Sequence, residues 1–408
     1  MTEQDTSLKW MVLILAGAVN FFVVGLSWMV MPVLFGEIMA KSGWTLPAIL
    51  LAWGLIPLAG VFLNLPAGIM GDKYGIRWVP AIGMICAGIF GALRGASDSI
   101  FMFQACMFLY GASFPFAFIL IPKALATYFP MQELGKANGI ATACYGTGGG
   151  LALLFGGTWL SPHLGGWQNL MYITGSLSVI VGVIWAMVIK PAPAAAAAPG
   201  APAVSIVGIL LGLIKNPMIL VLCVIYFLFM GGWIGASGIY PLLAPQTRGM
   251  TPQAAGAVIA IALWLYVAGA LIIPTFSDKI GRRRIVYCFG LLLSGLGMFL
   301  TFMSPPPSVW IWMALWGFFS GTIPLCFVIP FELKEVGPAL GGTAMALIAI
   351  SGSCGAFVFP VVTGYIAKAM DPASTMLWIG VLCGLIGYAS TGLLIWGVRE
   401  TGWKFPQK

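Results

Sequence analysis

Twelve long apolar runs dominate the sequence and leave few folds open to it. Each run has about 20 or more residues with few charges, the length that an α-helix needs to cross a bilayer. Only 7 % of the residues are charged, against roughly 25 % in soluble domains. The sequence therefore predicts an all-α integral membrane protein with twelve transmembrane helices. The predicted spans are residues 10–34, 46–70, 78–96, 100–128, 135–160, 168–189, 217–243, 253–276, 284–303, 308–331, 339–367 and 375–397.

A short charged loop occurs twice between these runs. The first copy is Gly68-Ile-Met-Gly-Asp72-Lys73-Tyr-Gly75-Ile-Arg77, and the second is Pro274-Thr-Phe-Ser-Asp278-Lys279-Ile-Gly281-Arg282-Arg283. The two aspartates lie 206 positions apart, and Ile121-Pro122 recurs as Ile329-Pro330 at an offset of 208. Glycine permits the tight reversal that each loop makes. The spacing predicts two six-helix pseudo-repeats arranged in parallel.

The predicted halves are residues 1–190 and 217–408. Residues 191–216 separate them and begin with a run of proline and alanine that is too broken to form a span. The following segment, residues 205–215, is too short to span and is predicted to lie along the cytoplasmic membrane surface. Residues 191–216 are therefore predicted to be a cytoplasmic linker.

The repeated loop resembles the signature loop of the major facilitator superfamily, which lies between spans two and three and again between spans eight and nine. The resemblance covers nearly the whole chain and implies the major facilitator fold, in which two halves enclose a cavity that opens alternately to each side. It implies that Asp72 faces the eleventh helix, and that Lys73 and Arg77 pair across the halves to close the cytoplasmic side. Pro274 replaces the glycine of the pattern, which weakens the same gating role for Asp278. The alternative is a loop that only sets topology.

Lysine and arginine are distributed unequally between the two sides of the predicted arrangement. Fifteen lie on the side of both termini, and only Lys41, Arg94, Arg248 and Lys368 lie on the other. Because positive loops face the cytoplasm, both termini are predicted to be cytoplasmic in a multi-pass protein of the cell inner membrane. The net charge of +8 then reflects topology and not a nucleic-acid partner. The N-terminus lacks the basic region of a signal peptide, so the first run is expected to remain as a span.

The sequence contains no pattern typical of a catalytic or metal site. All eight cysteines lie inside apolar runs without a C-x-x-C pair, which argues against disulfides and metal binding. The single histidine, His163, lies in a predicted outer loop. No nucleophile with a nearby histidine and no phosphate-binding loop occurs. We expect a protein that is not an enzyme, has no cofactor and acts as a monomer.

Spans one and seven present polar and aromatic residues on matching faces. Asn20 and Ser27 lie seven residues apart and share a helix face. The offset of 206 pairs Tyr226 with Asn20 and Trp233 with Ser27. Since spans one, four, seven and ten line the cavity in this family, we expect these four residues and Ser237 to contact substrate. The alternative is that they bond to neighbouring helices or fill packing surfaces.

Further candidates lie on spans four, five and ten. The predicted substrate residues there are Phe114, Phe118, Lys123, Tyr145, Trp316 and Ser320. By the helical rise, Lys123 sits about 10 Å inside the cytoplasmic end, at a depth where ionisable groups mark function. It is a candidate counterion for an anion, or one half of a gate with Glu332. A lysine near a helix end can instead extend to the membrane surface.

The substrate class is constrained by missing charges. No charged residue occurs in 10–36, 216–247 or 250–277, whereas relatives that move nitrate or oxalate hold the anion with arginine or lysine in mid-span. Span five also lacks the motif of proton-driven drug antiporters. We expect a symporter of a small weak organic acid, such as a monocarboxylate, with a proton as the candidate co-substrate. The alternatives are an exporter or facilitator of neutral or hydrophobic molecules, and a non-transporting sensor or assembly factor.

Overall fold

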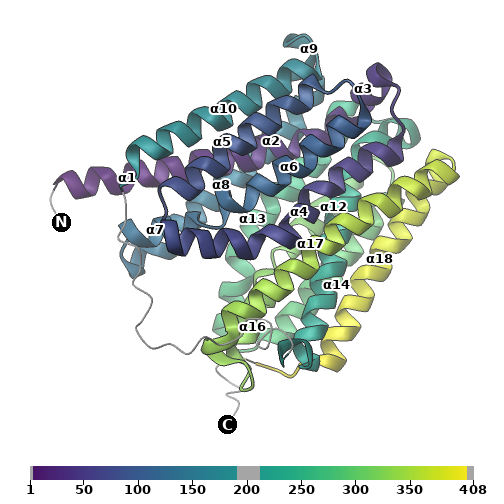
Figure 1. The fold of residues 1–408 in the computed structure, drawn as a ribbon. Coiled ribbons are helices and arrows are strands. Elements are labelled where there is room, and N and C mark those ends of the chain that lie inside the picture. Colours follow the sequence, from purple (N-terminus) through teal and green to yellow (C-terminus); the bar gives the residue numbers. More distant parts are fainter. Residues whose placement is uncertain (1–2, 191–211, 402–408) are drawn as a thin grey trace. The chain divides into compact units, whose positions relative to one another are not determined.

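The computed structural model describes residues 3–190 and 212–401, without the side chains of residues 3–7, 72, 131, 132, 135, 337–339, 341 and 342. Helices are the only regular elements in these ranges (Figure 1). The all-α membrane fold predicted from the apolar runs is confirmed. Most of the predicted linker, residues 191–211, and the side chain of Asp72 lie outside the described residues.

The helices before the predicted linker include two π-helical segments, η1 and η3, and one 3₁₀ turn, η2. In chain order they are α1 (Glu3–Ala18), η1 (Val19–Leu26), α2 (Ser27–Met29), α3 (Met31–Ser42), α4 (Leu46–Tyr74), α5 (Trp78–Leu93), η2 (Arg94–Ala96), α6 (Ile100–Phe118), α7 (Ile121–Tyr128), α8 (Met131–Phe155), η3 (Gly156–Leu160), α9 (Ser161–His163) and α10 (Trp167–Val188).

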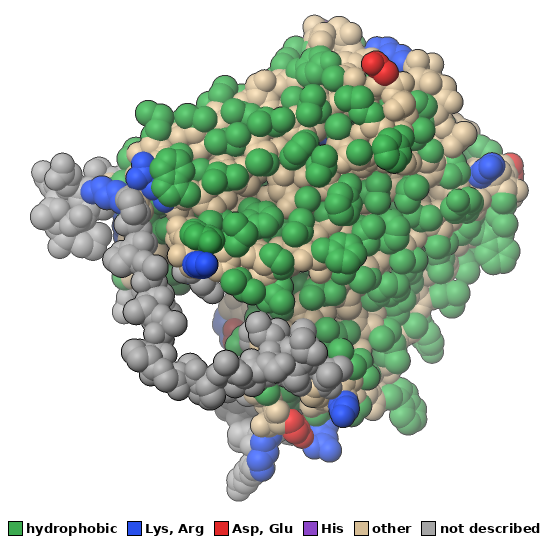
Figure 2. Space-filling view, viewed as in Figure 1, with side chains coloured by type: hydrophobic (Ala, Val, Ile, Leu, Met, Phe, Trp, Pro, Cys, Tyr) green, Lys and Arg blue, Asp and Glu red, His purple; other side chains and the backbone are tan. Residues whose placement is uncertain are grey.

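The helices after the predicted linker are longer and more regular. They are α12 (Pro217–Arg248), α13 (Pro252–Ile280), α14 (Arg283–Met303), α15 (Val309–Ser320), α16 (Pro324–Glu332), α17 (Gly337–Ala369) and α18 (Pro372–Gly397). Together with the first set, they place apolar side chains over most of the face seen in Figure 2, with acidic and basic side chains near its margins. Such a surface suits a lipid environment and not water.

Eleven helical stretches of the described chain are long and apolar enough to cross a membrane. The predicted span at 135–160 is not among the eleven. This segment folds as α8 and η3, but Asn138 and the glycines at 148–150 dilute its apolar content. Its helical character agrees with the prediction, whereas its composition is that of a helix packed against other helices.

Two predicted spans are interrupted by proline. Residues 100–128 divide into α6 and α7, and residues 308–331 divide into α15 and α16. Pro122 and Pro324 each stand in the first turn of the second piece. Proline has no N–H to donate and its ring clashes with the preceding turn, so a helix is broken on its N-terminal side. Lys123 is therefore carried by the short helix α7.

The described chain forms two compact units. Unit 1 contains residues 3–190 and Pro252–Ala260, and unit 2 contains residues 212–251 and 261–401. In unit 1, α10 packs along α5, α4 along α6, and α8 along η1. In unit 2, α12 packs along α17, and α18 packs along α14.

The pairs α5–α10 and α14–α18 use the same packing device. A Cβ atom added at Gly88 would lie 2.6 Å from the Gly175 carbonyl oxygen, and one added at Gly295 would lie 2.5 Å from the Gly387 Cα. Such distances leave no room for a side chain. Paired glycines let two helix backbones approach closely, which is the usual way to pack helices in lipid.

Candidate functional site

Span one contains a π-helical segment, η1, where it packs against α8. The two backbones nearly touch, because Gly25 lies against the Tyr145 carbonyl and Gly148 lies against the Phe21 carbonyl. A side chain at either glycine would clash with backbone atoms. Short π-helical turns inside α-helices are frequent at functional sites, so this crossing is a candidate site.

The π-helix frees backbone carbonyls that side chains then satisfy. The N–H of Ser27 donates to the Phe22 carbonyl, five residues back, and so leaves the Val23 carbonyl without its usual helical donor. The Tyr110 hydroxyl donates to the Val23 carbonyl at 2.9 Å. The irregular turn is therefore held from outside, by α6.

Arg94 holds the next part of span one. Its Nη1 and Nη2 atoms both lie 3.2 Å from the Ser27 carbonyl oxygen, and Nη2 also donates to Ser27 Oγ at 2.9 Å. Its Nε donates to the Gly91 carbonyl at 3.0 Å, and its Cζ lies 4.3 Å from the centre of the Tyr110 ring. The side chain is 0 % exposed.

Arg94 lies at the C-terminal end of α5, the end of the span at which the cation count placed it. It is fully buried inside unit 1 and is not a surface cation. The signal that could have found it is Gly91, three residues earlier on the helix, which lies beside the Arg94 guanidinium.

The polar residues predicted on span one are used within unit 1. Asn20 is 4 % exposed and donates to the Ala16 carbonyl at 2.9 Å. Ser27 is 0 % exposed and accepts the hydrogen bond from Arg94. The seven-residue spacing assumed a regular α-helix, and the π-helix between the two residues changes that register. Tyr145, on α8, is half-buried.

An aromatic face lies beside this cluster. The ring centres of Trp28 and Phe114 are 5.2 Å apart, and those of Phe114 and Phe118 are 5.9 Å apart. Phe118 is 40 % exposed. The structure thus brings together the two predicted phenylalanines and places Trp28 beside them. The indole N–H of Trp28 is buried and has no hydrogen-bond acceptor within the described residues.

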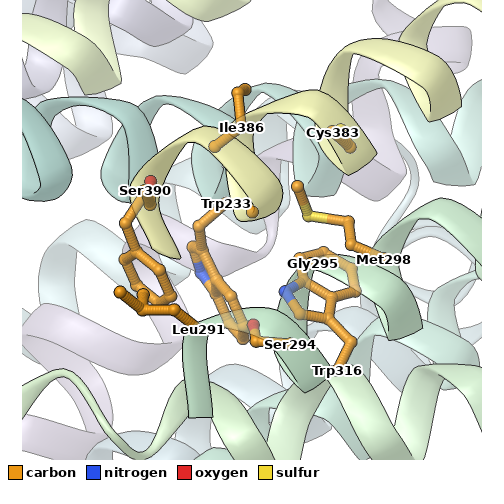
Figure 3. A pocket seen from close by; sticks show the side chains of 11 residues that line it. Trp233, Leu291, Ser294, Gly295, Met298, Trp316, Cys383, Ile386 and Ser390 are labelled. Atoms are coloured by element: carbon orange, nitrogen blue, oxygen red, sulfur yellow. The ribbon is translucent and has the colours of Figure 1, made fainter. Parts of the chain in front are cut away.

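Unit 2 has an aromatic cluster of its own. The rings of Trp233 and Trp316, both predicted site residues, are 4.9 Å apart, and they border a cavity of about 20 Å³ (Figure 3). That volume holds a single water molecule. Ser390 also lines the cavity, and its hydroxyl lacks a partner within the described chain.

The other predicted residues of unit 2 lie around this cluster. Ser320 Oγ lies 2.9 Å from Ser294 Oγ and donates to the Trp316 carbonyl at 2.7 Å. Ser237 is 1 % exposed and donates to the Ile234 carbonyl at 3.2 Å. Tyr226 is half-buried, with its ring centre 5.0 Å from that of Phe327. These hydroxyls therefore serve helix packing first.

The two copies of the charged loop turn at glycines with positive φ, 84° at Gly75 and 69° at Gly281. In the first copy, Arg77 Nε donates to the Ala186 carbonyl at 2.8 Å, and Lys73 lies exposed over the Tyr74 ring.

In the second copy, Arg283 bridges two acids. Its Nε donates to Glu332 Oε1 at 2.9 Å, and its Nη1 forms an ion pair with Asp278. Both acids were predicted gating residues, and the structure brings them together through an arginine. Glu332 Oε2 is buried and has no partner within the described chain.

Lys123 contacts the end of α4. Its Nζ atom lies 3.5 Å from the Gly71 carbonyl oxygen, next in sequence to Asp72, and its side chain is half-buried. The predicted counterion is thus placed beside the first charged loop, inside unit 1.

Sequence reasoning missed Glu37, an acid at the far end of span one. Glu37 accepts hydrogen bonds from Lys41 at 2.8 Å, from Ser161 at 2.5 Å and from the backbone N–H of Trp167 at 3.1 Å. It therefore joins α3 to α9 and to the first turn of α10. Helical spacing indicates the contact with Lys41, four residues away. It does not indicate the contacts with Ser161 and Trp167, which lie more than 120 residues away.

Comparison with known proteins places these observations in a family. The Major Facilitator Superfamily matches residues 13–231 and 222–407 of the chain. The chain is 24 % identical over 403 residues to the D-galactonate transporter of Escherichia coli O6:H1 strain CFT073, covering 90 % of both proteins. It is 22 % identical over 371 residues to the probable galactarate/D-glucarate transporter GarP of Escherichia coli K12, covering 78 % of this chain and 79 % of that one.

Solved structures share the fold at low sequence identity. A bacterial homologue of the human lysosomal transporter Spinster, inward-facing and occupied, has a TM-score of 0.76 and 16 % identity over 100 % of both chains. The nucleoside transporter NupG has a TM-score of 0.73 and 17 % identity, covering 95 % of this chain and 98 % of that one. The chain belongs to the Major Facilitator Superfamily and is a multi-pass secondary transporter of a small molecule, not an enzyme.

Proposed function

We propose that the protein carries a small organic acid across the bacterial inner membrane by alternating access, with both termini in the cytoplasm. The observation that supports this most is the similarity to the D-galactonate transporter, which runs over 90 % of both chains. A second relative is named for galactarate and D-glucarate. The proposed substrate class is a hydroxy acid of this kind, or a smaller monocarboxylate.

The described side chains offer the chemistry that such a substrate requires. The faces of Phe114 and Phe118 suit the C–H groups of a polyol chain, and the unpartnered N–H of Trp28 is a donor for a hydroxyl or carboxylate oxygen. Trp233 and Trp316 provide a similar aromatic surface in unit 2. Lys123 supplies a cation near the first charged loop.

We assign the two charged loops to gating. Asp72, Lys73 and Arg77 would latch one half, and the Asp278–Arg283–Glu332 network would latch the other. Glu332 is also the proposed proton carrier. Its Oε2 atom is buried and has no hydrogen-bond partner within the described chain, and a proton bound there would remove the uncompensated negative charge and make this oxygen a hydrogen-bond donor. Symport of one proton would offset the charge of a monoanion.

Uptake into proteoliposomes tests the proposal. Labelled D-galactonate, D-glucarate and L-lactate would be offered with and without an imposed inward proton gradient. We expect saturable uptake of at least one acid, accelerated by the gradient. Saturable uptake at the same rate with and without the gradient would overturn proton coupling but would still support transport of an organic acid. Binding of an acid without uptake would support a sensor, and no interaction with any of the three would refute the proposed substrate class.

A further inference from the structure

Arg94 is a buried cation whose charge no described side chain of unit 1 neutralises. Its described partners are the Ser27 carbonyl and hydroxyl, the Gly91 carbonyl, the Met107 sulfur at 3.9 Å and the Tyr110 ring. All of these are neutral acceptors. A guanidinium group stays protonated in proteins, so a full positive charge remains inside the bundle.

Among the side chains that the structure describes, no carboxylate faces this charge from the elements packed around it. Asp98 follows Arg94 by four residues but lies exposed in the loop before α6. Glu37 stands ten residues beyond Ser27, about 15 Å along the helix axis, and is paired with Lys41. The electric field of Arg94 therefore acts on any ligand that binds at the neighbouring Trp28–Phe114 face.

A hydrogen-bonding role alone does not account for a charged group here. A neutral donor could satisfy the Ser27 and Gly91 carbonyls without the large desolvation cost of a buried ion. The charge brings a gain only when an anion comes near. From these contacts we infer that Arg94 is a specificity-determining residue: its field makes the Trp28–Phe114 face of unit 1 selective for anions, without touching the substrate.

The size of the effect follows from the distances. The Arg94 Cζ lies 4.3 Å from the Tyr110 ring centre, which lies 6.2 Å from that of Phe114. The Phe114 ring centre therefore lies no further than these two distances together from the guanidinium carbon. For an anion about 10 Å away, at an effective dielectric constant of about 20, the attraction changes the affinity about tenfold. A dianion should gain more than a monoanion. This inference rests on the proposed function, because it requires an anionic substrate.

Met107 offers a test that leaves Arg94 in place. Its side chain is 0 % exposed and its sulfur faces the guanidinium. Met107→Glu would put a carboxylate beside Arg94 and neutralise it, whereas Met107→Gln has the same shape and no charge. Dissociation constants of D-galactonate and galactarate would be measured for the purified wild-type protein and both variants. We expect Met107→Gln to resemble the wild type, and Met107→Glu to bind D-galactonate about tenfold more weakly and galactarate more weakly still.

The outcomes separate the two proposals. If the wild type binds either acid but the glutamate and glutamine variants bind equally well, the role of Arg94 is overturned and the proposed function stands. If the wild type binds neither acid, both fall together. Should Met107→Glu fail to fold, the pair Arg94→Lys and Arg94→Gln gives the same contrast. Lysine should keep the preference for galactarate over D-galactonate and glutamine should lose it, and equal preferences would overturn the inference.

Discussion

Arg77 and Arg283 occupy equivalent positions in the two charged loops but bind different partners. The offset of 208 that relates Pro122 to Pro330 pairs Glu332 with Ala124. Unit 1 thus has Ala124 at the position where unit 2 has Glu332, the acid that accepts a hydrogen bond from Arg283. Arg77 instead donates to the Ala186 carbonyl at the end of α10. The planar guanidinium binds the acceptor within its reach in each unit, a carbonyl for Arg77 and a carboxylate for Arg283.

The pair Arg283–Glu332 should contribute measurably to the stability of unit 2. The side chains are 13 % and 25 % exposed, so solvent screens the pair less than a surface ion pair. A double-mutant cycle of Arg283→Gln and Glu332→Gln should give a coupling energy of about 1 kcal/mol in the unfolding of the detergent-solubilised protein. Glu335→Gln, an exposed acid three residues further on, is the control and should change little. Strictly additive effects of the two substitutions would contradict the network.

Single residues were predicted unevenly from the sequence. Phe114 and Phe118 are neighbours through helical spacing, as the sequence indicates. The pairs Trp233–Trp316 and Asp278–Glu332 join different helices, and neither contact follows from spacing or from the repeat. Arg94 and Glu37 were missed. Their roles depend on contacts with partners far away in sequence, Ser27 for Arg94 and Trp167 for Glu37, which no local pattern encodes.

At the scale of elements, glycine contacts determine how the helices pack and where they deviate. The π-helix η1 lies where Gly25 and Gly148 bring span one and α8 into backbone contact. The apolar runs located the helices well, since hydropathy measures length and composition. Hydropathy could not indicate a π-helix, because a π-helix can have the same composition as an α-helix and differs in the number of residues per turn. The prediction that Asn20 and Ser27 share a helix face used the α-helical period, whereas the residues between them lie in the π-helix Val19–Leu26.

Two glycines of α18 should respond oppositely to the same substitution. A Cβ at Gly387 would press on the Gly295 backbone, whereas one at Gly392 meets no atom within 4 Å. Gly387→Ala should therefore lower the free energy of unfolding by about 1–3 kcal/mol, as overpacking does. Gly392→Ala should leave it unchanged or slightly raised, because alanine favours a helix. Thermal unfolding of the two purified variants compares them directly, and equal melting temperatures would contradict close packing of α14 against α18.

For the whole molecule, the repeat was the most informative signal in the sequence. Two charged loops half a chain apart predicted the family, and the family fixes the number and kind of elements. Helix ends followed proline and glycine, as at Pro122 and Gly281. The cargo was not encoded in the same way, because it depends on a few side chains whose positions the helical period alone does not determine.

Membrane topology provides the last prediction. Fifteen cations on one side of the predicted twelve-span arrangement, against four on the other, predict that the charged loops face the cytoplasm. Single cysteines at exposed positions in a cysteine-free background should report it. Asp98→Cys and Lys368→Cys should react with a membrane-impermeant maleimide on intact cells, whereas Lys73→Cys and Lys279→Cys should react only after the membrane is permeabilised. All four side chains are exposed in the structure, so a difference reflects the side of the membrane and not burial. Labelling of the two loop positions on intact cells would place both gates outside the cell and overturn the proposed orientation.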